Sequence, residues 1–402
     1  MIMRLFTLFA SATLASAANS NDTSSPFPKF SGDPFRKYNI SAEGINASFV
    51  PYGARMTNMW VPDRNGTQQD IVVGYDDAQN YTTQRNFFGA VVGRYANRIK
   101  NGTFEVDGHT YHTPLNENDH DTLHGGDFGY DMRNWTIIKH TEDSITFMLY
   151  DKAYEGFPGD VVNLATYTVT DEPAFYSRIT SIPTGDRTPI MIANHVYWNL
   201  GAFVDEEALT ILNDTLHMPA AKRYINIDGW EVPTGNISMT KDTPLDFLQP
   251  KKIGKDINET VNGCGTGCLG YDNAFILDLP RSASPGDPSR EALVWSSPVT
   301  GIRMSLYTNQ DSLQLYTCDT QDGSIKAKQD QQHINGNTTY EQFGCMVIET
   351  QDVSTSCIRF ERDIFYMFMD LHGVLSSGST ASTSLNGVEK TTSYMTRRQC
   401  PS

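Results

Sequence analysis

The sequence predicts an all-β protein, a large antiparallel β-sandwich with few short helices. Short runs of residues alternate between apolar and polar side chains, which is the period of a strand with one buried face. Turn residues separate these runs, and no sustained helical stripe accompanies them. Because strands do not alternate with helix-length segments, a parallel nucleotide-binding sheet is disfavoured.

The strand signals can be followed along the chain. Residues 103–106 alternate and lead into Asp107-Gly108, a favoured two-residue hairpin turn. Asn101-Gly102, just before this run, predicts another hairpin turn in tandem with the first. Alternation with β-branched and aromatic residues predicts four further strands, at residues 145–150, 165–170, 303–307 and 313–316.

The N-terminus predicts export. Residues 1–17 carry one early basic residue, Arg4, then an apolar run, and they end in three small residues, which is the pattern of a secretory signal peptide. A short buried helix is the alternative, but a helix needs no small-residue end. We expect residues 18–38 to form a flexible mature N-terminus. No linker interrupts residues 39–402, which we therefore expect to form a single domain.

Eleven Asn-x-Ser/Thr sequons favour glycosylation in a eukaryotic secretory route and a secreted, extracellular protein. Some are expected to stay unmodified, above all Asn134, because its neighbour Trp135 has the character of a core residue. The sequon asparagines are Asn21, Asn39, Asn46, Asn65, Asn80, Asn101, Asn134, Asn213, Asn236, Asn258 and Asn337.

Six cysteines lie between residues 264 and 400, an even number that suits disulfides in an oxidising compartment. The sequence leaves their pairing open. In Gly263 to Cys268 a cysteine stands where a dinucleotide-binding fingerprint needs its third glycine, so the segment does not match that fingerprint. We interpret it as a disulfide-pinned loop. A zinc site is disfavoured, since Cys264 and Cys268 have no matching Cys or His pair at finger-like spacing.

Charge and hydropathy narrow the possible partners. The chain has 31 basic and 47 acidic side chains, a formal charge of −16, and basic residues cluster only in pairs. Such a protein repels a phosphate backbone, so nucleic acid is not an expected partner. No stretch beyond the N-terminus approaches the roughly 18 apolar residues of a membrane span. We expect a monomer or weak dimer that acts on a small molecule and associates with no membrane.

Three segments place polar residues inside otherwise apolar strands. His195 lies within residues 194–200, Glu349 follows a run of apolar residues within 344–351, and Gln314 faces opposite to its leucine neighbours. Each one alone is explained by a buried polar residue with a structural partner. Together they indicate chemistry, because His and Glu are the usual general acid and base.

Several blocks of the chain resemble, in the same order, the motifs of the aldose 1-epimerases, also called galactose mutarotases. The resemblance runs from about Tyr52 to Glu389 and so covers nearly all of the expected mature chain. The blocks are GRYANRI (93–99), LHGG (123–126), GYDMRNW (129–135), NHVYWNL (194–200), GYDN (270–273), LQLYT (313–317) and IETQ (348–351). They resemble GR-x-ANRI, LHGG, GFDxRxW, NHSYFNL, GYDH or GFDH, LQxYT and LETQ.

The resemblance implies a mutarotase-like supersandwich with an open carbohydrate cleft, no metal and no cofactor. Position by position, Glu349 corresponds to the general base and His195 to the general acid. The residues that correspond to sugar-binding positions are Asn97, Arg98, His124, Asp272 and Gln314. The chain departs from the family pattern at Val196 and Trp198, which should face the core, in the 263–268 loop, and after Gln351, where the change bears on sugar preference.

The implied reaction, the interconversion of the α and β anomers of a free aldohexose, suits these residue types. A base must take the proton of the C1 hydroxyl while an acid protonates the ring oxygen, and we expect the two groups on opposite sides of the ring. With ordinary pKa values, Glu349 would be charged and His195 could hold or release a proton. Two alternatives stay open. A glycoside hydrolase would use two carboxylates, such as Asp272 and Glu349, and a non-catalytic carbohydrate-binding protein would only hold the sugar.

Overall fold

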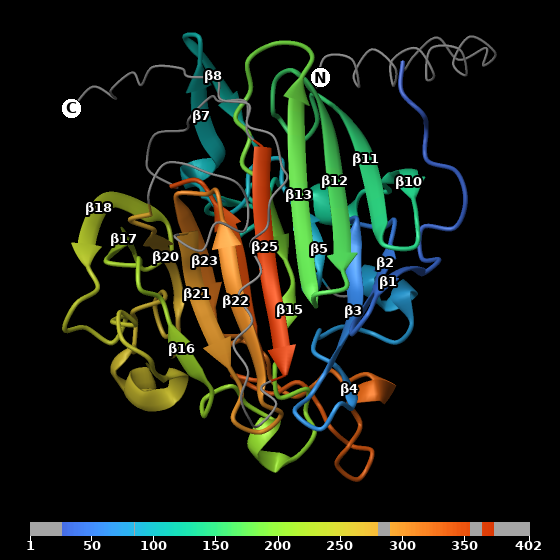
Figure 1. Cartoon of the computed structure of the whole chain (residues 1–402). Helices are drawn as coiled ribbons and strands as arrows, with labels where there is room; N and C mark the ends of the chain where they lie inside the picture. Colours follow the sequence, from blue (N-terminus) through green and yellow to red (C-terminus); the bar gives the residue numbers. More distant parts are fainter. Residues whose placement is uncertain (1–25, 84, 280–289, 354–363, 374–402) are drawn as a thin grey trace.

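The computed structural model describes residues 26–83, 85–279 and 290–353, and the backbone of 364–373. The expected signal peptide lies outside the described residues, as do Asn21, Cys357 and Cys400. Antiparallel strands dominate, so the predicted fold class is confirmed (Figure 1). The helices of the described part are short 3-10 turns: η1 (Ala78–Thr82), η2 (Lys100–Gly102), η3 (Tyr130–Met132), η4 (Glu206–Ala208), η5 (Ile253–Glu259) and η7 (Gln329–Gln331).

A nine-stranded antiparallel sheet faces the viewer in Figure 1, with β25 near its middle. Long strands of the first half of the chain form one side of this sheet, and β25 joins them to strands of the second half. In spatial order its strands are β10 (Thr136–His140), β11 (Ser144–Lys152), β12 (Asp160–Thr170), β13 (Ala174–Pro183), β25 (Ile364–Gly373), β22 (Ile302–Thr308), β21 (Glu291–Ser296), β16 (Thr215–His217) and β19 (Lys251–Lys252).

A six-stranded sheet carries most of the residues that matter for function. Its strands are β15 (Tyr197–Trp198), β24 (Met346–Gln351), β23 (Ser312–Tyr316), β20 (Asp272–Ile276), β17 (Arg223–Ile227) and β18 (Pro233–Met239). A four-stranded sheet holds β1 (Tyr38–Ala42), β2 (Ile45–Val50), β3 (Arg55–Pro62) and β4 (Gln68–Asp70). Three two-stranded sheets pair β5 (Ala90–Val92) with β14 (Ala193–His195), β6 (Arg98–Ile99) with β9 (Thr122–Leu123), and β7 (Thr103–Val106) with β8 (His109–His112).

One apolar core joins the two large sheets. Leu315 and Ile348 of the six-stranded sheet and Trp295 and Met304 of the nine-stranded sheet are buried in the same cluster. Removing this much apolar surface from water is the main favourable contribution to folding, and it fixes which face of each strand points inward. The opposite face of β20, β23 and β24 is therefore free to carry polar groups.

The predicted strands are found, with two corrections. All five runs lie within β7, β11, β12, β22 and β23, and the Asp107-Gly108 hairpin joins β7 to β8. The tandem hairpin at Asn101-Gly102 was wrong, because these residues form the 3-10 turn η2 and β6 pairs with β9 instead. Residues 194–200 are not one strand either: β14 and β15 break at Val196 and join different sheets. Val196 and Trp198 are buried, as expected.

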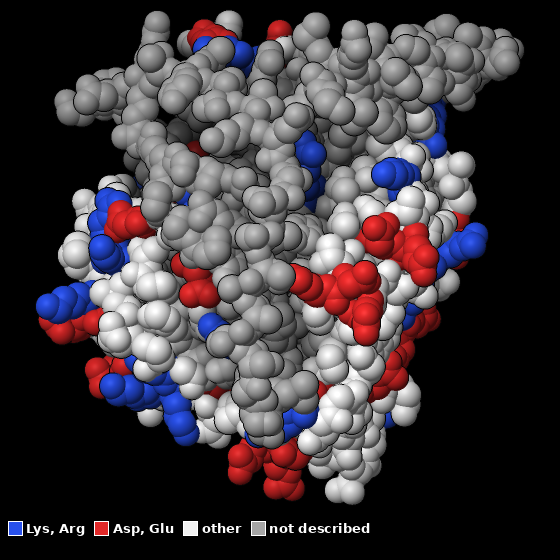
Figure 2. All heavy atoms as spheres, viewed as in Figure 1, with Lys and Arg blue, Asp and Glu red and all other residues white. Residues whose placement is uncertain are grey.

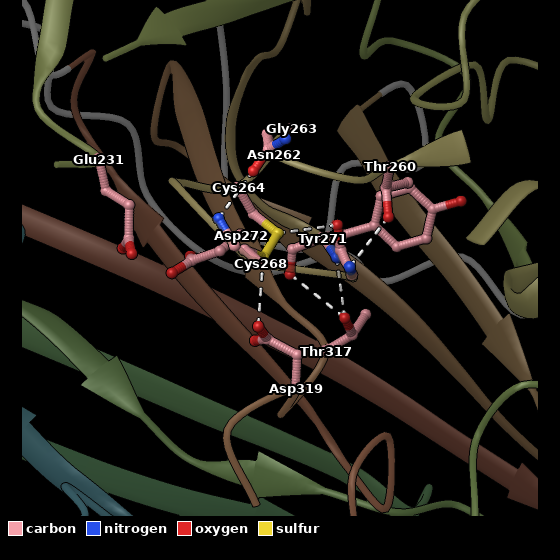
Figure 3. The surroundings of a disulfide bond; sticks show 12 residues. Glu231, Thr260, Asn262, Gly263, Cys264, Cys268, Tyr271, Asp272, Thr317 and Asp319 are labelled. Atoms are coloured by element: carbon pink, nitrogen blue, oxygen red, sulfur yellow. Dashed lines mark hydrogen bonds between the residues drawn. A yellow bond between two sulfur atoms is a disulfide. The ribbon is translucent and has the colours of Figure 1, made fainter. Parts of the chain in front are cut away.

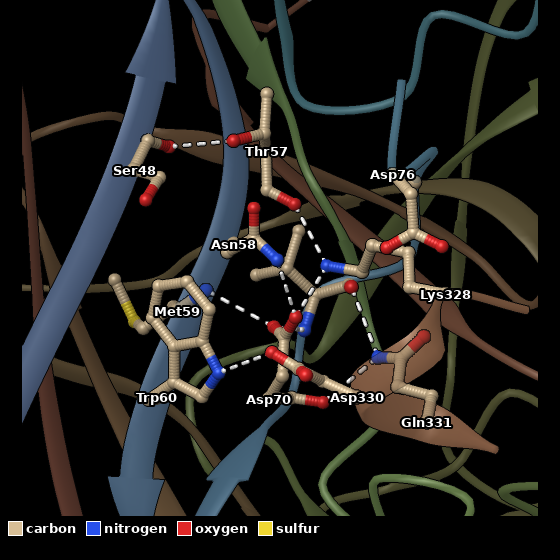
Figure 4. Close-up of polar contacts among 12 residues, drawn as sticks. Ser48, Thr57, Asn58, Met59, Trp60, Asp70, Asp76, Lys328, Asp330 and Gln331 are labelled. Atoms are coloured by element: carbon tan, nitrogen blue, oxygen red, sulfur yellow. Dashed lines mark hydrogen bonds and ion pairs between the residues drawn. The ribbon is translucent and has the colours of Figure 1, made fainter. Parts of the chain in front are cut away.

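A fully buried ion pair ties the segment around η7 to the four-stranded sheet (Figure 4). The ammonium group of Lys328 lies 2.5 Å from a carboxylate oxygen of Asp70 and donates to the backbone oxygen of Thr57 at 2.8 Å. Asp70 also accepts from the side chain of Asn58 at 2.7 Å. Because both charges have several hydrogen-bonding partners, their burial is compensated, and the network links positions 258 residues apart in the chain.

The cysteines form two disulfides within the described residues. Cys264 pairs with Cys268, which confirms the disulfide-pinned loop, and Cys318 pairs with Cys345. The second bond joins the segment after β23 to the segment before β24, the neighbouring strands that carry Gln314 and Glu349.

The charges on the surface agree with the absence of basic clusters in the sequence. Lys and Arg side chains are interspersed with Asp and Glu on the face shown in Figure 2, where the described residues form no extended basic surface. None of the helices among the described residues has the length and apolar character needed to span a bilayer.

Candidate active site

Strand register brings three of the predicted site residues together. Glu349 on β24 lies directly opposite Gln314 on β23, and Gln314 lies opposite Ala274 on β20. Asp272 is two residues before Ala274, so it projects from the same face of the sheet. Three residues far apart in the sequence therefore share one polar face, whose reverse side is the core.

His195 reaches this face from β14. The preceding residue, Asn194, is anchored in the core, where it accepts a hydrogen bond from the Tyr167 hydroxyl at 2.9 Å and donates to Ser177. Asn199 of the same block donates to the backbone oxygen of Gly344 at 2.8 Å. The two asparagines of this block are therefore structural, and they hold the histidine between them in a fixed position.

Arg98 lies in the small β6–β9 sheet, opposite Leu123, while Asn97 directly precedes β6 and His124 directly follows β9. His124 has φ 50° and Asn97 has φ 60°, a left-handed conformation that costs free energy for residues other than glycine. The next residue, Gly125, is the first glycine of the LHGG block, and its position requires a glycine. A Cβ atom there would lie 2.1 Å from the backbone oxygen of Gly93, so a side chain cannot fit.

Glu349 and His195 face each other at the buried end of the site. Nε2 of His195 lies 3.6 Å from Oε1 of Glu349, and both side chains are almost fully buried. Nδ1 of His195 and Oε2 of Glu349 make no hydrogen bond to any described residue. The expectation that a sugar ring lies between the two groups is wrong, because 3.6 Å leaves no space for it. C1 carries both the hydroxyl and the ring oxygen, so two adjacent groups can reach both oxygens from one edge of the ring.

Burial shifts both pKa values away from the ordinary values that the sequence analysis assumed. It raises the pKa of Glu349 well above 4.5, and it lowers the pKa of His195 to about 3. Desolvation favours the neutral form of each group. At pH values between these two pKa values the pair holds one proton, on Glu349. The reactive arrangement, with a charged carboxylate and an imidazolium, differs from it only in the position of that proton.

His124, Asn97 and Gln351 form the next part of the site. Nδ1 of His124 accepts from the backbone N–H of Asn97 at 3.2 Å, which leaves Nε2 to donate into the site. Burial lowers the pKa of His124 well below its ordinary value, so the ring is neutral. The Asn97 side chain donates to Gln351 at 2.7 Å, and the Nε2 amide group of Gln351 is buried with no partner among the described residues.

Acidic groups surround Arg98 at the more open end. Its guanidinium donates to Glu117 at 3.2 Å and forms an ion pair with Glu231. Asp272 accepts from Gln314 at 2.5 Å and points toward Glu231 (Figure 3). Burial raises the pKa of Asp272 and raises that of Glu231 to about 7, so the Glu231 carboxyl can donate as well as accept near neutral pH.

A small pocket opens beside Arg98 and Glu231. Its lining combines polar and apolar side chains, which suits a sugar with hydroxyls at its edge and C–H bonds on its faces. Its lining residues are Asn97, Arg98, Ile225, Ile227, Glu231, Pro233, Ala274, Gln314 and Gln351.

His124, His195 and Glu349 also present ligand atoms within 4.8 Å of one another, so they could surround one cation. The sequence analysis predicted no metal. The same three groups suffice for proton transfer and hydroxyl binding, and we derive no step that requires an ion.

All seven predicted residues lie at this site, and the structure adds two more. Gln351 lies two residues after Glu349, so strand alternation could have placed it on the same face. Glu231 lies on the turn between β17 and β18, with φ 65°, and no motif in the sequence marks it. Its position follows from the 263–268 disulfide loop, where a Cβ atom on Gly265 would lie 2.7 Å from the Glu231 side chain.

The pair of Glu349 and His195 suits proton transfer, and the donors and acceptors of the pocket suit hydroxyl groups. Together they define the class: an acid–base enzyme that acts on a carbohydrate.

Comparisons with known proteins identify the family. The profile of the family described as aldose 1-epimerase matches residues 36–360. A probable aldose 1-epimerase from Arthroderma benhamiae is 46% identical over 352 residues, covering 80% of this chain and 79% of the relative. The galactose mutarotase of Homo sapiens is 28% identical over 322 residues, covering 80% of this chain and 86% of that protein. The chain therefore belongs to the aldose 1-epimerase family, and it is a mutarotase.

A solved structure shares the fold. The crystal structure of an aldose epimerase homologue from C. elegans has a TM-score of 0.71 and 26% identity, and the match covers 84% of this chain and 99% of the other. The supersandwich expected from the sequence motifs is thus the observed architecture.

Proposed function

We propose that this mutarotase interconverts the anomers of free aldohexoses such as glucose and galactose, with Glu349 as the base and His195 as the acid. The observation that carries this proposal is the buried pair of one carboxyl and one imidazole, 3.6 Å apart, each with one polar atom that no described residue satisfies. A sugar's C1 hydroxyl and ring oxygen supply the missing partners.

The steps balance without a cofactor. In the reactive tautomer, the Glu349 carboxylate takes the proton of the C1 hydroxyl while the His195 imidazolium protonates the ring oxygen, and the C1–O5 bond breaks. The pair is then neutral, with the proton on Glu349, which is the state that burial favours. Rotation about C1–C2 and the reverse transfers close the ring to either anomer. Because each group both gives and takes a proton, the enzyme returns to its starting state.

The remaining site residues bind and orient the ring. Nε2 of His124 and the free amide N–H of Gln351 donate to hydroxyls near the catalytic pair. Arg98, Asp272 and Gln314 offer both donors and acceptors at the other end. Holding the ring in one position relative to Glu349 and His195 contributes to the rate as well as to affinity.

Polarimetry on freshly dissolved α-D-glucose and α-D-galactose tests the function. Faster approach to an unchanged final rotation supports the mutarotase. Release of an aglycone from glycosides would instead indicate a hydrolase, and sugar binding without either change would indicate a carbohydrate-binding protein. The close pair of Glu349 and His195 favours the first outcome, because hydrolysis needs two carboxylates astride the bond.

We also propose that the protein is a secreted eukaryotic glycoprotein that acts as a monomer or weak dimer. The signal-peptide pattern, the eleven sequons and the two disulfides support export. Expression with residues 1–17 in a secreting host should give a glycosylated protein in the medium whose N-terminus lies near Ala18. Retention in the cell would contradict this, and sedimentation at several concentrations tests the oligomeric state.

A further inference from the structure

An exposed tryptophan stands on the turn between β17 and β18. Trp230 is 51% exposed, whereas Trp135, Trp198 and Trp295 are fully buried. Its ring lies parallel to that of His120, with centroids 4.9 Å apart and an interplanar angle of 14°. The stack with His120 supports the indole, and the exposed half of the ring is available to a ligand.

The turn that carries this ring is held firmly. Asp228 accepts hydrogen bonds from the backbone N–H groups of Trp230 at 2.9 Å and Val232 at 3.1 Å. The backbone N–H of Thr266 donates to the carbonyl of Gly229 at 3.0 Å, which fixes the turn to the disulfide loop. A rigid aromatic ring loses little conformational freedom when a ligand stacks on it, so the turn is prepared for binding.

Glu231, the chain neighbour of Trp230, lines the pocket and lies at the more exposed end of the site. Glu349 and His195 have side chains only 3% and 6% exposed, whereas Glu231, which follows Trp230 and contacts Arg98, is 28% exposed. The catalytic pair is thus the deep end and the Glu231 side is the mouth. A pyranose with C1 at the catalytic pair has C4 at the opposite end of its ring, toward the mouth and Trp230.

We propose that Trp230, backed by His120, forms a second sugar subsite that takes the non-reducing unit of a reducing disaccharide. This inference rests on the proposed function, because it requires the reducing ring to have its C1 at Glu349 and His195. The C–H face of the second ring stacks on the indole, whose face is electron-rich. The partner is a neutral sugar, since Glu117, Glu231 and Asp272 outnumber Arg98 and disfavour an anionic one.

Polarimetry with α-lactose and α-D-glucose tests the proposal, because glucose is the reducing ring of lactose. Trp230→Ala should lower kcat/KM for lactose about tenfold, the factor that ~1.4 kcal/mol of lost contact gives, while kcat/KM for glucose stays within about twofold. Trp230→Phe should restore much of the lactose rate, because it keeps a flat ring. The matched control is Ile237→Ala, which removes an exposed apolar side chain from β18 of the same hairpin and should change neither rate.

Three results would overturn the subsite while the proposed function stands. In the first, the wild type accelerates mutarotation of glucose but not of lactose. In the second, wild type and Trp230→Ala have equal kcat/KM for lactose. In the third, Trp230→Ala lowers kcat/KM equally for both sugars. Failure of the wild type to accelerate mutarotation of either sugar would instead remove the proposed function itself.

Discussion

At the scale of single residues, the two histidines of the site have different tasks. Nε2 of His195 faces Glu349, while His124 is anchored through Nδ1 to the Asn97 backbone. His195→Asn should therefore lower kcat by roughly 10²–10⁴-fold with little change in sugar affinity, as loss of a general acid does. His124→Asn should raise KM and lower kcat together. Initial-rate polarimetry separates the two, and a His195→Asn variant with wild-type kcat would remove this residue from the mechanism.

The shifted pKa values predict an unusual pH profile. Catalysis needs a single proton on the pair. The pair holds that proton when the pH is above the lowered pKa of His195, about 3, and below the raised pKa of Glu349. We therefore expect kcat/KM to be high in acid and to fall as the pH rises through the pKa of the carboxyl, well above 4.5. An ordinary carboxylate base would give a rate that rises through pH 4–5. A profile that rises there and stays flat to pH 9 would contradict the one-proton pair.

Much of the site was predictable from the sequence because motif residues carry it, but the geometry was not. Strand alternation placed Gln314 and Glu349 correctly relative to the core. It could not show that Glu349 and His195 lie 3.6 Å apart, or that burial shifts both pKa values toward the neutral form, because both depend on packing between strands far apart in the chain. Glu231 was missed since its turn has no periodic signal.

At the scale of elements, the buried Lys328–Asp70 pair joins the η7 segment to β3 and β4. Lys328→Met leaves the Asp70 carboxylate buried without its cation, so it should lower the free energy of unfolding by roughly 3–5 kcal/mol. Urea denaturation measures the change, and Lys326→Met, an exposed neighbour, serves as control. Adding Asp70→Asn to Lys328→Met should recover part of the loss, because no unpaired charge remains. If Lys328→Met were as stable as the control, this network would not stabilise the fold.

Elements whose signal is contained in a few neighbouring residues were found at their predicted places. Elements that depend on which strand they pair with were not. Asp107-Gly108 makes its hairpin because the turn chemistry is contained in two residues. Asn101-Gly102 has the same chemistry, yet it forms a 3-10 turn because β6 pairs with β9 rather than with β7. Residues 194–200 break into two strands for the same reason, since β14 and β15 pair with different sheets.

At the scale of the whole molecule, one buried carboxyl links stability to pH. Asp214 accepts a hydrogen bond from Trp295 at 2.8 Å, and burial raises its pKa to about 7. The native state thus keeps a proton that the unfolded chain releases near pH 4, so this contribution to stability is complete below about pH 4 and is lost as the pH rises through 7.

Asp214→Asn cannot ionise, so relative to wild type it should gain roughly 3–4 kcal/mol of unfolding free energy between pH 4 and pH 8. Denaturation at both pH values checks this, with the exposed Asp322→Asn as control. An equal difference between Asp214→Asn and wild type at the two pH values would show that Asp214 has no raised pKa.

The central claim is that the Glu349–His195 pair moves the protons of anomer interconversion. The most direct test measures α/β exchange of glucose at equilibrium by NMR, alongside sugar affinity, for wild type and Glu349→Gln. We predict that the variant folds and binds sugar with an affinity near that of wild type, while enzyme-catalysed exchange falls by at least about 10²-fold. A Glu349→Gln protein that binds sugar normally and exchanges the anomers at the wild-type rate would contradict the account.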